Sequence, residues 1–240
     1  RQPGTAAKPR RRPTAPAAGE LPPELAVHER PLSGIAEAVR TIRTNLVFMD
    51  PDHPLRTLAV SSSGPSEGKT TVACSLAVGM AQAGRRVCIV DCDLRRPRLH
   101  RIFDRVGDEG LTAVLIGEAK LEAVVKPTIV DGLSSIPAGA IPPNPGDLLH
   151  SERFRRFVET LREQFDCVVL DTPPVVAVSD SAIISTLVDG TVFVVRANKT
   201  SRHLAKQGLR AFRDVGARVL GVVLNAVDVK GAQYEHFRQY

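Results

Sequence analysis

The 240-residue sequence predicts an α/β fold in which helices cover both faces of a parallel β-sheet. Apolar runs of strand length alternate along the chain with segments of helical periodicity, as the crossover connections between parallel strands require. The runs are nearly continuous in apolar residues rather than alternating, which indicates strands buried on both faces. In addition, the turn between the first run and the helix after it is rich in glycine and small polar residues.

The expected elements follow in chain order. The first is a helix over residues 33–48, where Ile35, Val39, Ile42 and Leu46 recur at helical spacing. The pattern then predicts strands over residues 58–61, 87–90, 167–170, 192–195 and 220–224. It predicts further helices over residues 70–83, 154–164, 179–187 and 201–215, with Gly84 ending the first of these.

Composition predicts one folded domain with a segment on either side. Residues 1–31 are rich in Pro, Ala and Arg and show no apolar period, so we expect a flexible basic linker there. Residues 32–229 contain every expected element, and residues 230–240 are expected to form a mobile tail. Half of the net charge of +6 lies in the first 30 residues, where the run Lys8–Arg12 is suited to contact anionic lipid headgroups.

Several classes of protein are disfavoured by composition. The four cysteines show no metal-binding spacing, so we expect reduced thiols of a cytosolic kind. No run approaches the roughly 18 apolar residues of a membrane span, so a membrane link would lie outside this sequence. The first residue is Arg1 rather than Met, and we interpret the chain as part of a longer protein. With 4% aromatic content and no Trp, we expect no nucleic-acid partner.

The segment Ser63–Thr71, SGPSEGKTT, has the context of a phosphate-binding loop, between an apolar strand and a helix. Glycines there let backbone N–H groups approach phosphates, a lysine neutralises phosphate oxygens and a threonine hydroxyl can reach Mg²⁺. Ser63 replaces the first glycine of the usual GxxxxGK[ST] pattern. A glycine-rich turn with an incidental lysine is the alternative. The expected nucleotide contacts are Gly64, Pro65, Ser66, Glu67, Gly68, Lys69, Thr70 and Thr71.

Two carboxylates follow the second strand, in CIVDCDLRRP. Asp91 and Asp93 should point to the same side of an extended backbone, at the edge where open parallel sheets form their sites. They can converge on one Mg²⁺ or divide into a metal ligand and a base, with Arg95 just beyond. A solvated turn with a helix-capping aspartate is the simpler alternative.

A third acid, Asp171, ends another apolar strand in VVLDTPPV, which is a Walker B position. An aspartate there holds the Mg²⁺ of a bound nucleotide, directly or through water. An apolar strand followed by Asp is common, but this motif, the pair Asp91 and Asp93, and the phosphate-binding loop together indicate a single Mg-nucleotide site. We therefore expect ATP as the nucleotide, with Thr70, Asp93 and Asp171 around Mg²⁺.

In this order the three motifs resemble those of the bacterial protein-tyrosine kinases, over nearly everything from Leu32 to Asp228. That family carries Walker A, A′ and B motifs on a P-loop NTPase fold of the deviant-Walker, MinD-like type. The resemblance implies autophosphorylation from Mg-ATP, with Lys69, Asp91 and Arg95 as catalytic residues. Asp91 would orient or deprotonate a tyrosine hydroxyl, while Lys69 and Arg95 would neutralise charge on the transferred phosphoryl group.

The resemblance extends to other segments. EAVRTIRTNL is similar to the family's ExxRxxR helix, which implies that Glu37, Arg40 and Arg43 take part in ring-like self-association. A polar helix face with local Glu–Arg pairing is the alternative. The stretch IPAGAIPPNPGDLLHS at residues 136–151 also resembles a family segment, without an evident chemical role. Asn225 resembles the place where relatives contact the nucleotide base.

Both tyrosines of the sequence, Tyr234 and Tyr240, lie in its last seven residues. The family phosphorylates itself on a C-terminal tyrosine cluster, usually a denser one, so these are the expected acceptors, presented to a neighbouring subunit. The resemblance further implies control of exopolysaccharide or capsule synthesis and export on the cytoplasmic side of the plasma membrane. The implied partner is a membrane activator, a polysaccharide co-polymerase, which we expect to be fused upstream.

The main alternative comes from the same superfamily: a partition or septum-positioning ATPase that acts as a hydrolytic switch without kinase activity. Those ATPases carry a signature lysine five positions before the P-loop lysine. Gly64 occupies that position in this sequence, which favours the kinase.

Overall fold

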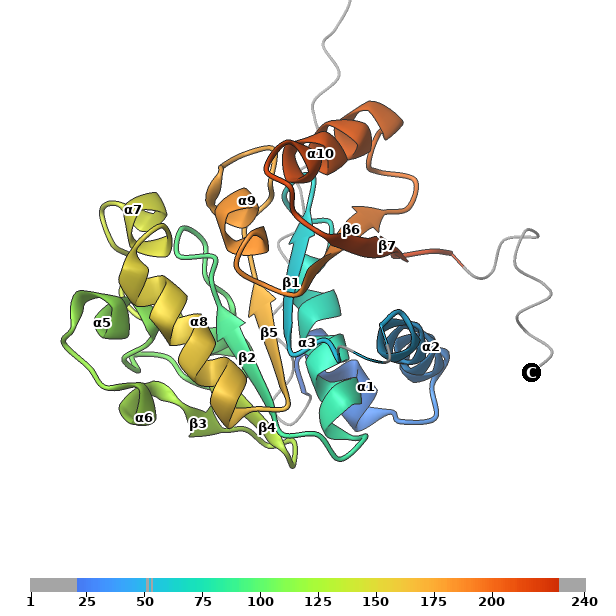
Figure 1. The fold of residues 1–240 in the computed structure, drawn as a ribbon. Coiled ribbons are helices and arrows are strands. Elements are labelled where there is room, and N and C mark those ends of the chain that lie inside the picture. The colour runs from blue at the N-terminus through green and yellow to red at the C-terminus, as the bar shows by residue number, and fades with distance from the viewer. Residues whose placement is uncertain (1–20, 51, 53, 229–240) are drawn as a thin grey trace, which may run out of the picture.

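The computed structural model describes residues 21–50, 52 and 54–228 of the chain. These residues contain one seven-stranded sheet in the order β3-β4-β2-β5-β1-β6-β7, and only β3 runs antiparallel to its neighbour (Figure 1). The strands are β1 (Thr57–Ser62), β2 (Val87–Asp91), β3 (Lys126–Pro127), β4 (Leu133–Ile136), β5 (Cys167–Asp171), β6 (Gly190–Arg196) and β7 (Val219–Asn225). The predicted α/β class is confirmed.

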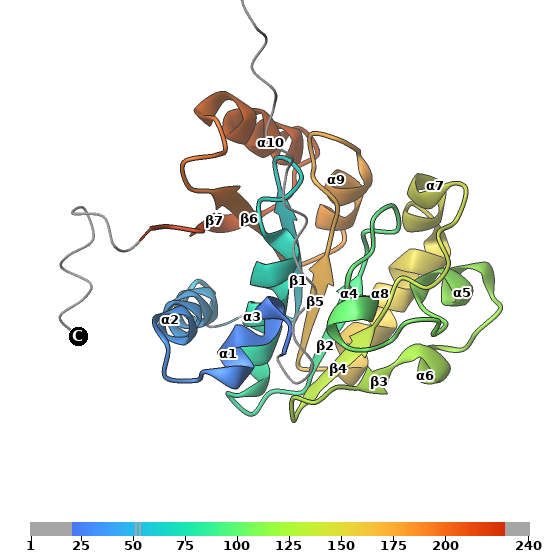
Figure 2. The ribbon, with the colours of Figure 1, turned by 180° about the vertical axis from the view of Figure 1, so that it is seen from behind.

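Helices cover both faces of this sheet (Figures 1 and 2). The longer ones are α2 (Gly34–Phe48), α3 (Lys69–Ala81), α8 (Glu152–Gln164) and α10 (Arg202–Asp214). The shorter ones are η1 (Pro23–Leu25), α1 (Ala26–Glu29), α4 (Leu99–Ile102), α5 (Leu111–Ile116), α6 (Leu121–Val124), α7 (Pro145–Leu149) and α9 (Asp180–Ser185). Among the described helices, none is both long enough and apolar enough to cross a membrane.

Successive residues of the central strands pack into different cores. On β1, Leu58 and Val60 join the core beneath α1, α2 and α3, whereas Ala59 joins the core beneath α5 and α8. This alternation follows from the twofold period of an extended strand. It explains why the strands read as continuous apolar runs, because each face of the sheet is covered by a helix layer.

The folded region begins earlier than the sequence predicts. Residues 21–31 were expected to belong to the flexible linker, but η1 and α1 lie within them. Leu25 and Val27 are each 1% exposed and join the core of α2 and α3. The predicted boundary at residue 32 is therefore wrong, because a short segment with only two deeply buried apolar residues has no detectable period. The rest of the predicted linker lies outside the described residues.

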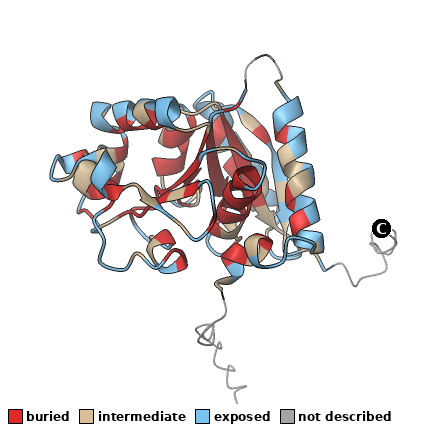
Figure 3. Ribbon diagram, turned by 90° about the horizontal axis from the view of Figure 1, so that it is seen from below, coloured by how far each residue is buried: buried red, intermediate tan, exposed pale blue. Residues whose placement is uncertain are grey.

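Two predicted burial patterns also need correction. On α2, Ile35 is 58% exposed and Ala36 takes the inner position, because the buried stripe of this helix runs through Ala36, Val39 and Leu46. On β7, Val222 and Leu224 are 54% and 51% exposed, although their strand is an apolar run. Figure 3 shows the contrast with the buried central strands. As the last strand of the sheet, β7 lacks the second neighbour and full helix cover that the run implied.

Candidate active site

The phosphate-binding loop lies between the carboxyl end of β1 and the amino end of α3, a 13-residue helix. A helix start of this kind presents free N–H groups and the positive end of the helix dipole to an anion. Gly68 adopts φ 94°, and a Cβ at this position would lie 1.9 Å from Nδ2 of Asn225. Only glycine fits here, for both reasons. Ser66 also has positive φ, at 63°, so the loop is tightly curled.

The next residue, Lys69, reaches across the ends of two neighbouring strands. Its Nζ lies 2.9 Å from Oδ2 of Asp93 and 3.7 Å from Oδ1 of Asp171. Burial by itself lowers the pKa of Lys69, but attraction to Asp171 and Asp93 outweighs it and the pKa is raised. The ammonium group is therefore charged, and it lies among the acids at the carboxyl edge of the sheet.

Asp171 is the acid best suited to a metal ion. It is 1% exposed, and neither carboxylate oxygen has a hydrogen-bond partner among the described residues. Burial raises the pKa of Asp171, and attraction to Lys69 offsets this only in part. A buried carboxylate without hydrogen-bond donors is costly unless cations neutralise it, and Lys69 does so only from 3.7 Å. Together with Asp93 and the Thr70 hydroxyl, it offers the oxygen ligands that Mg²⁺ prefers.

Within the described residues, no group of three or more His, Cys, Asp or Glu side chains is arranged to hold a metal ion. This agrees with the usual binding of Mg²⁺ at nucleotide sites, where one or two carboxylates act together with phosphate oxygens and water. The residues present therefore fit Mg²⁺ as part of a nucleotide complex rather than as a free-standing metal centre.

Asp91 is placed differently from its neighbour Asp93. Its Oδ2 accepts hydrogen bonds from the backbone N–H groups of Arg98 and Leu99, at 2.8 and 2.9 Å, and Oδ1 accepts from the N–H of Asp93. The side chain is fully buried, and burial followed by repulsion from Asp171 raises its pKa to about 7. In this geometry Asp91 holds the start of α4 and orients Asp93. Its predicted role as a base stays a prediction.

Arg95 is turned toward a partner that the sequence did not suggest. Its Nε and Nη2 donate to the two carboxylate oxygens of Asp180 at 2.8 and 3.1 Å, and Asp180 is fully buried. A Cβ at Gly146 would lie 3.5 Å from Asp180 and 3.9 Å from Arg95, so the start of α7 packs directly against this pair. The segment 136–151 thus has a structural contact with the Walker A′ region. A phosphate contact by Arg95 stays a prediction.

The loop is also held from the side by the strand ends of β6 and β7. Glu67 accepts from the N–H of Gly64 at 3.0 Å and from the hydroxyl of Thr200. Arg196 donates to the carbonyl of Ser66 at 2.9 Å, and Asn225 donates to the carbonyl of Glu67 at 2.9 Å. We call this set of four hydrogen bonds the loop clamp. Sequence reasoning missed Thr200 and Arg196, because they lie more than a hundred residues beyond the loop and belong to no motif.

The predicted assembly residues lie on α2. Glu37 and Arg40 form an ion pair of 2.6 Å on the exposed side of the helix. Arg43 donates to the carbonyl of Gly79 at 3.0 Å and so fastens α2 to α3 within the same chain. Their role in self-association stays a prediction. The predicted acceptors Tyr234 and Tyr240 lie outside the described residues.

Comparisons with known proteins agree with the motifs. A model of the ParA family, described as NUBPL iron-transfer P-loop NTPase, matches residues 55–239. The chain is 33% identical over 214 residues to the putative tyrosine-protein kinase CapB of Staphylococcus aureus, covering 89% of this chain and 94% of CapB. It is 35% identical over 208 residues to the tyrosine-protein kinase YwqD of Bacillus subtilis, covering 86% and 88%. The chain belongs to the bacterial tyrosine-protein kinases.

Solved structures of a bacterial tyrosine kinase and of a related ATPase have the same fold as this bacterial tyrosine kinase. The kinase domain of Escherichia coli tyrosine kinase ETK superposes with a TM-score of 0.84 at 31% identity, covering 93% of this chain and 87% of that one. The septum site-determining protein MinD of Pyrococcus horikoshii, complexed with Mg-ADP, shares the fold with a TM-score of 0.60 at 22% identity. The chain covers only 28% of the tyrosine-protein kinase wzc of Salmonella typhimurium, so it corresponds to one part of that longer protein.

Proposed function

We propose that this chain transfers the γ-phosphate of Mg-ATP to tyrosines of its own C-terminal tail. The observation that carries the proposal is the position of Lys69 between Asp93 and Asp171, at the mouth of a phosphate-binding loop. A lysine beside two acids at a helix start can exchange those acids for phosphate oxygens when nucleotide and metal enter together. The family relationship supplies the type of acceptor, a tyrosine hydroxyl.

Phosphoryl transfer depends mainly on positioning and charge neutralisation. In the proposal, backbone N–H groups of residues 64–71 bind the phosphates, and Lys69 turns from the acids to the β and γ oxygens. Thr70, Asp93 and Asp171 would hold Mg²⁺, which neutralises phosphate charge when bound. Asn225 would add a contact to the base, next to its hydrogen bond with the loop.

Two further roles belong to the proposal. Asp91 would orient or deprotonate the tyrosine, acting either directly or through Asp93, which it positions. Arg95 would contribute charge near the transferred group from its place on Asp180. The acceptors would be Tyr234 and Tyr240, presented by a neighbouring copy of the chain.

The biological setting is also part of the proposal. Glu37, Arg40 and Arg43 would support a ring-like homo-oligomer. Each phosphotyrosine adds about −1.5 to −2 charge, so several phosphorylated tails would repel one another and favour dispersal of the ring. We propose that the cycle regulates exopolysaccharide or capsule synthesis and export at the cytoplasmic side of the bacterial plasma membrane. A membrane activator would be its partner, and no nucleic acid takes part.

Kinase activity is distinguished from the ATPase alternative by its product. Purified chain incubated with Mg-ATP should yield phosphotyrosine at Tyr234 or Tyr240 by mass spectrometry, and the double variant Tyr234→Phe/Tyr240→Phe should yield none there. Mixing that double variant with a Lys69→Met chain tests transfer between molecules. Phosphotyrosine on the Lys69→Met chain would establish that one copy phosphorylates another.

Other results would contradict the kinase proposal or the transfer between molecules. If ATP is hydrolysed in a Lys69-dependent way while no phosphotyrosine forms, the chain is a hydrolytic switch and the kinase proposal is wrong. If wild type is phosphorylated but the mixed variants are not, transfer takes place within one molecule.

A further inference from the structure

The outward side of α10 carries a cluster of basic residues that the nucleotide site does not use. Its members are exposed and consist of Arg202, His203, Lys206, Arg210 and Arg213, which we call the α10 basic face. At about 100° per residue they lie on one side of the helix. The opposite side packs on the sheet, since Phe212 is fully buried and a Cβ at Gly208 would lie 2.7 Å from the ring of Phe193.

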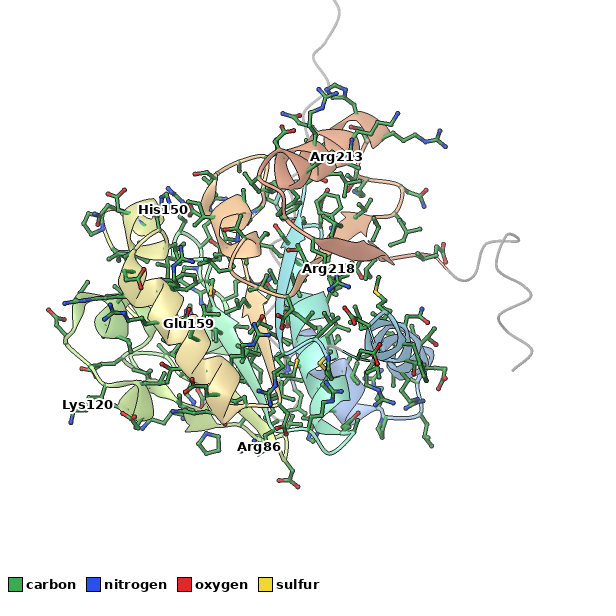
Figure 4. The ribbon with its side chains drawn as sticks, in the orientation of Figure 1. Arg86, Lys120, His150, Glu159, Arg213 and Arg218 are labelled. Atoms are coloured by element: carbon green, nitrogen blue, oxygen red, sulfur yellow. The ribbon has the colours of Figure 1, made fainter. Side chains whose placement is uncertain are left out.

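The residues of the α10 basic face have no acidic partners among the described residues. Exposed arginines elsewhere form ion pairs, for example Arg86 with Asp166 and Arg162 with Asp189. Over the described part of the chain, no ion pair involves a residue of the α10 basic face. Figure 4 shows side chains of α10, including Arg213, extending away from the body of the protein. Their positive field is therefore not neutralised by ion pairs with the described residues.

Charge is distributed unevenly over the whole molecule. Between Arg196 and Arg218 the chain has seven lysines and arginines against a single acid, Asp214. Residues 21–228 together have 25 lysines and arginines against 24 acids, so the part outside this segment is net negative. Such an asymmetry orients a protein relative to a charged surface, because one side is attracted and the other repelled.

The shape and composition of the α10 basic face indicate what kind of partner it would bind. From Arg202 to Arg213 the face is about 17 Å long, at about 1.5 Å per residue. It lies along one helix, and the aromatic residue of that helix, Phe212, is buried. Single-stranded nucleic acid is bound in basic grooves with exposed aromatic rings, and this face offers no such ring. A flat row of cations is complementary instead to a flat anionic surface.

We propose that the α10 basic face binds the headgroups of an anionic phospholipid bilayer. Lysines and arginines near such a surface attract it additively, within the Debye length of the solution. The bound protein would lie with α10 toward the lipid and with its net negative remainder away from it. This binding does not require kinase activity, so it is tested separately from the proposed function.

The test measures sedimentation of the full chain with vesicles of mixed phosphatidylglycerol and phosphatidylcholine, and with vesicles of phosphatidylcholine alone. Wild type should bind only the anionic vesicles and be released at about 0.5 M salt, where screening is strong. The variant R202Q/K206Q/R210Q/R213Q should bind them at least about tenfold more weakly. Its phosphotransfer rate without lipid should be unchanged, because none of the four residues contacts the nucleotide loop.

Two matched controls remove the same number of charges elsewhere. K120Q/K126Q/R155Q/R156Q alters the side of the body that holds α6 and α8, and K8Q/R10Q/R11Q/R12Q alters the basic run near the amino terminus. Both should retain most of the affinity of wild type for anionic vesicles. The second control changes none of the described residues, so it tests the proposal even if the α10 variant fails to fold.

Four outcomes overturn the proposal. The first is wild type that does not bind anionic vesicles. The second is an α10 variant, folded by circular dichroism, that binds as tightly as wild type. The third is an amino-terminal variant that loses all binding. The fourth is wild type that binds an oligouridine RNA or an acidic peptide through α10 but does not bind the vesicles.

Discussion

The central strands and the β6–β7 edge of the sheet start from similar sequences and end in different environments. All five residues of β5 are buried, whereas Val222 and Leu224 of β7 are about half exposed. The reason is position, because β5 lies between β2 and β1 while β7 has β6 as its one neighbour. An apolar run therefore predicts a strand, but only the strand order decides how deeply that strand is buried.

The two regions also differ in how their charged side chains are paired and exposed. At the end of the central strands, Lys69 lies close to the buried Asp93 and Asp171, where electrostatic interactions are strong. Over the β6–β7 edge, the cations of α10 are exposed and have no acidic partner among the described residues. The first arrangement is suited to chemistry on one bound molecule. The second is suited to attraction at longer range.

The largest expected effect comes from the buried charges. Lys69→Met should lower the initial rate of phosphotyrosine formation by about 10²–10³-fold, because the developing phosphate charge loses its neutralising partner. The measurement is a time course with Mg-ATP, with Lys126→Met as a control that should stay near the wild-type rate. A loss of less than about tenfold for Lys69→Met would remove this residue from the site.

The difference in burial should appear directly in stability. Leu170→Ala on β5 creates a cavity in a fully buried site and should lower the free energy of unfolding by about 2–5 kcal/mol. Leu224→Ala on β7 removes a side chain that is 51% exposed and should cost less than about 1 kcal/mol. Urea denaturation of both variants checks the prediction. Equal losses would mean that the edge is covered in solution, for instance by another copy.

The buried acids should give the nucleotide-free protein an unusual dependence on pH. Because the pKa of Asp91 is raised to about 7, the folded protein holds a proton that the unfolded chain releases near pH 4. The contribution of Asp91 is therefore fully present below about pH 4 and is lost as the pH rises through about 7. The free energy of unfolding should therefore decrease by about 2 kcal/mol between pH 5 and pH 7.

Urea midpoints at pH 5, 6 and 7 measure this slope, and Asp91→Asn should flatten it. The partly exposed Asp166, whose pKa is lowered by its hydrogen bonds with Arg86, contributes in the opposite direction only as the pH falls below about 4. An identical slope in wild type and Asp91→Asn would show that Asp91 does not carry the effect.

The smallest expected effect on activity connects the two regions through the loop clamp. Thr200→Val removes the hydroxyl that donates to Glu67, so the loop should lose part of its preorganisation. We expect about a tenfold rise in KM for ATP, equivalent to about 1.4 kcal/mol, with kcat changed less. Thr200→Ser should restore the wild-type KM, whereas a merely structural effect of residue size would not be rescued. An unchanged KM in Thr200→Val would exclude the clamp from nucleotide binding.

Much of the candidate site could be predicted because its residues adjoin strong local patterns. Lys69 follows a glycine-rich turn, and Asp91, Asp93 and Asp171 each follow an apolar strand, so parallel strand ends bring them to one edge of the sheet. Their individual hydrogen bonds could not be predicted. Asp91 and Asp93 are two residues apart, yet one holds the start of α4 and the other contacts Lys69.

The sequence by itself determined the α/β class, the three motifs and the family, because periodicity and short motifs are local properties of the chain. Tertiary structure alone decided the partners that come from distant segments: Asp180 for Arg95, Thr200 for Glu67, and the early helices that begin the fold before residue 32. It also decided that β7 is an edge and that the α10 basic face has no acidic partner in the described part of the chain. The physical reason is that burial, hydrogen bonding and charge pairing depend on which elements are in contact in the folded protein. The spacing of residues along the chain does not predict those contacts between distant segments.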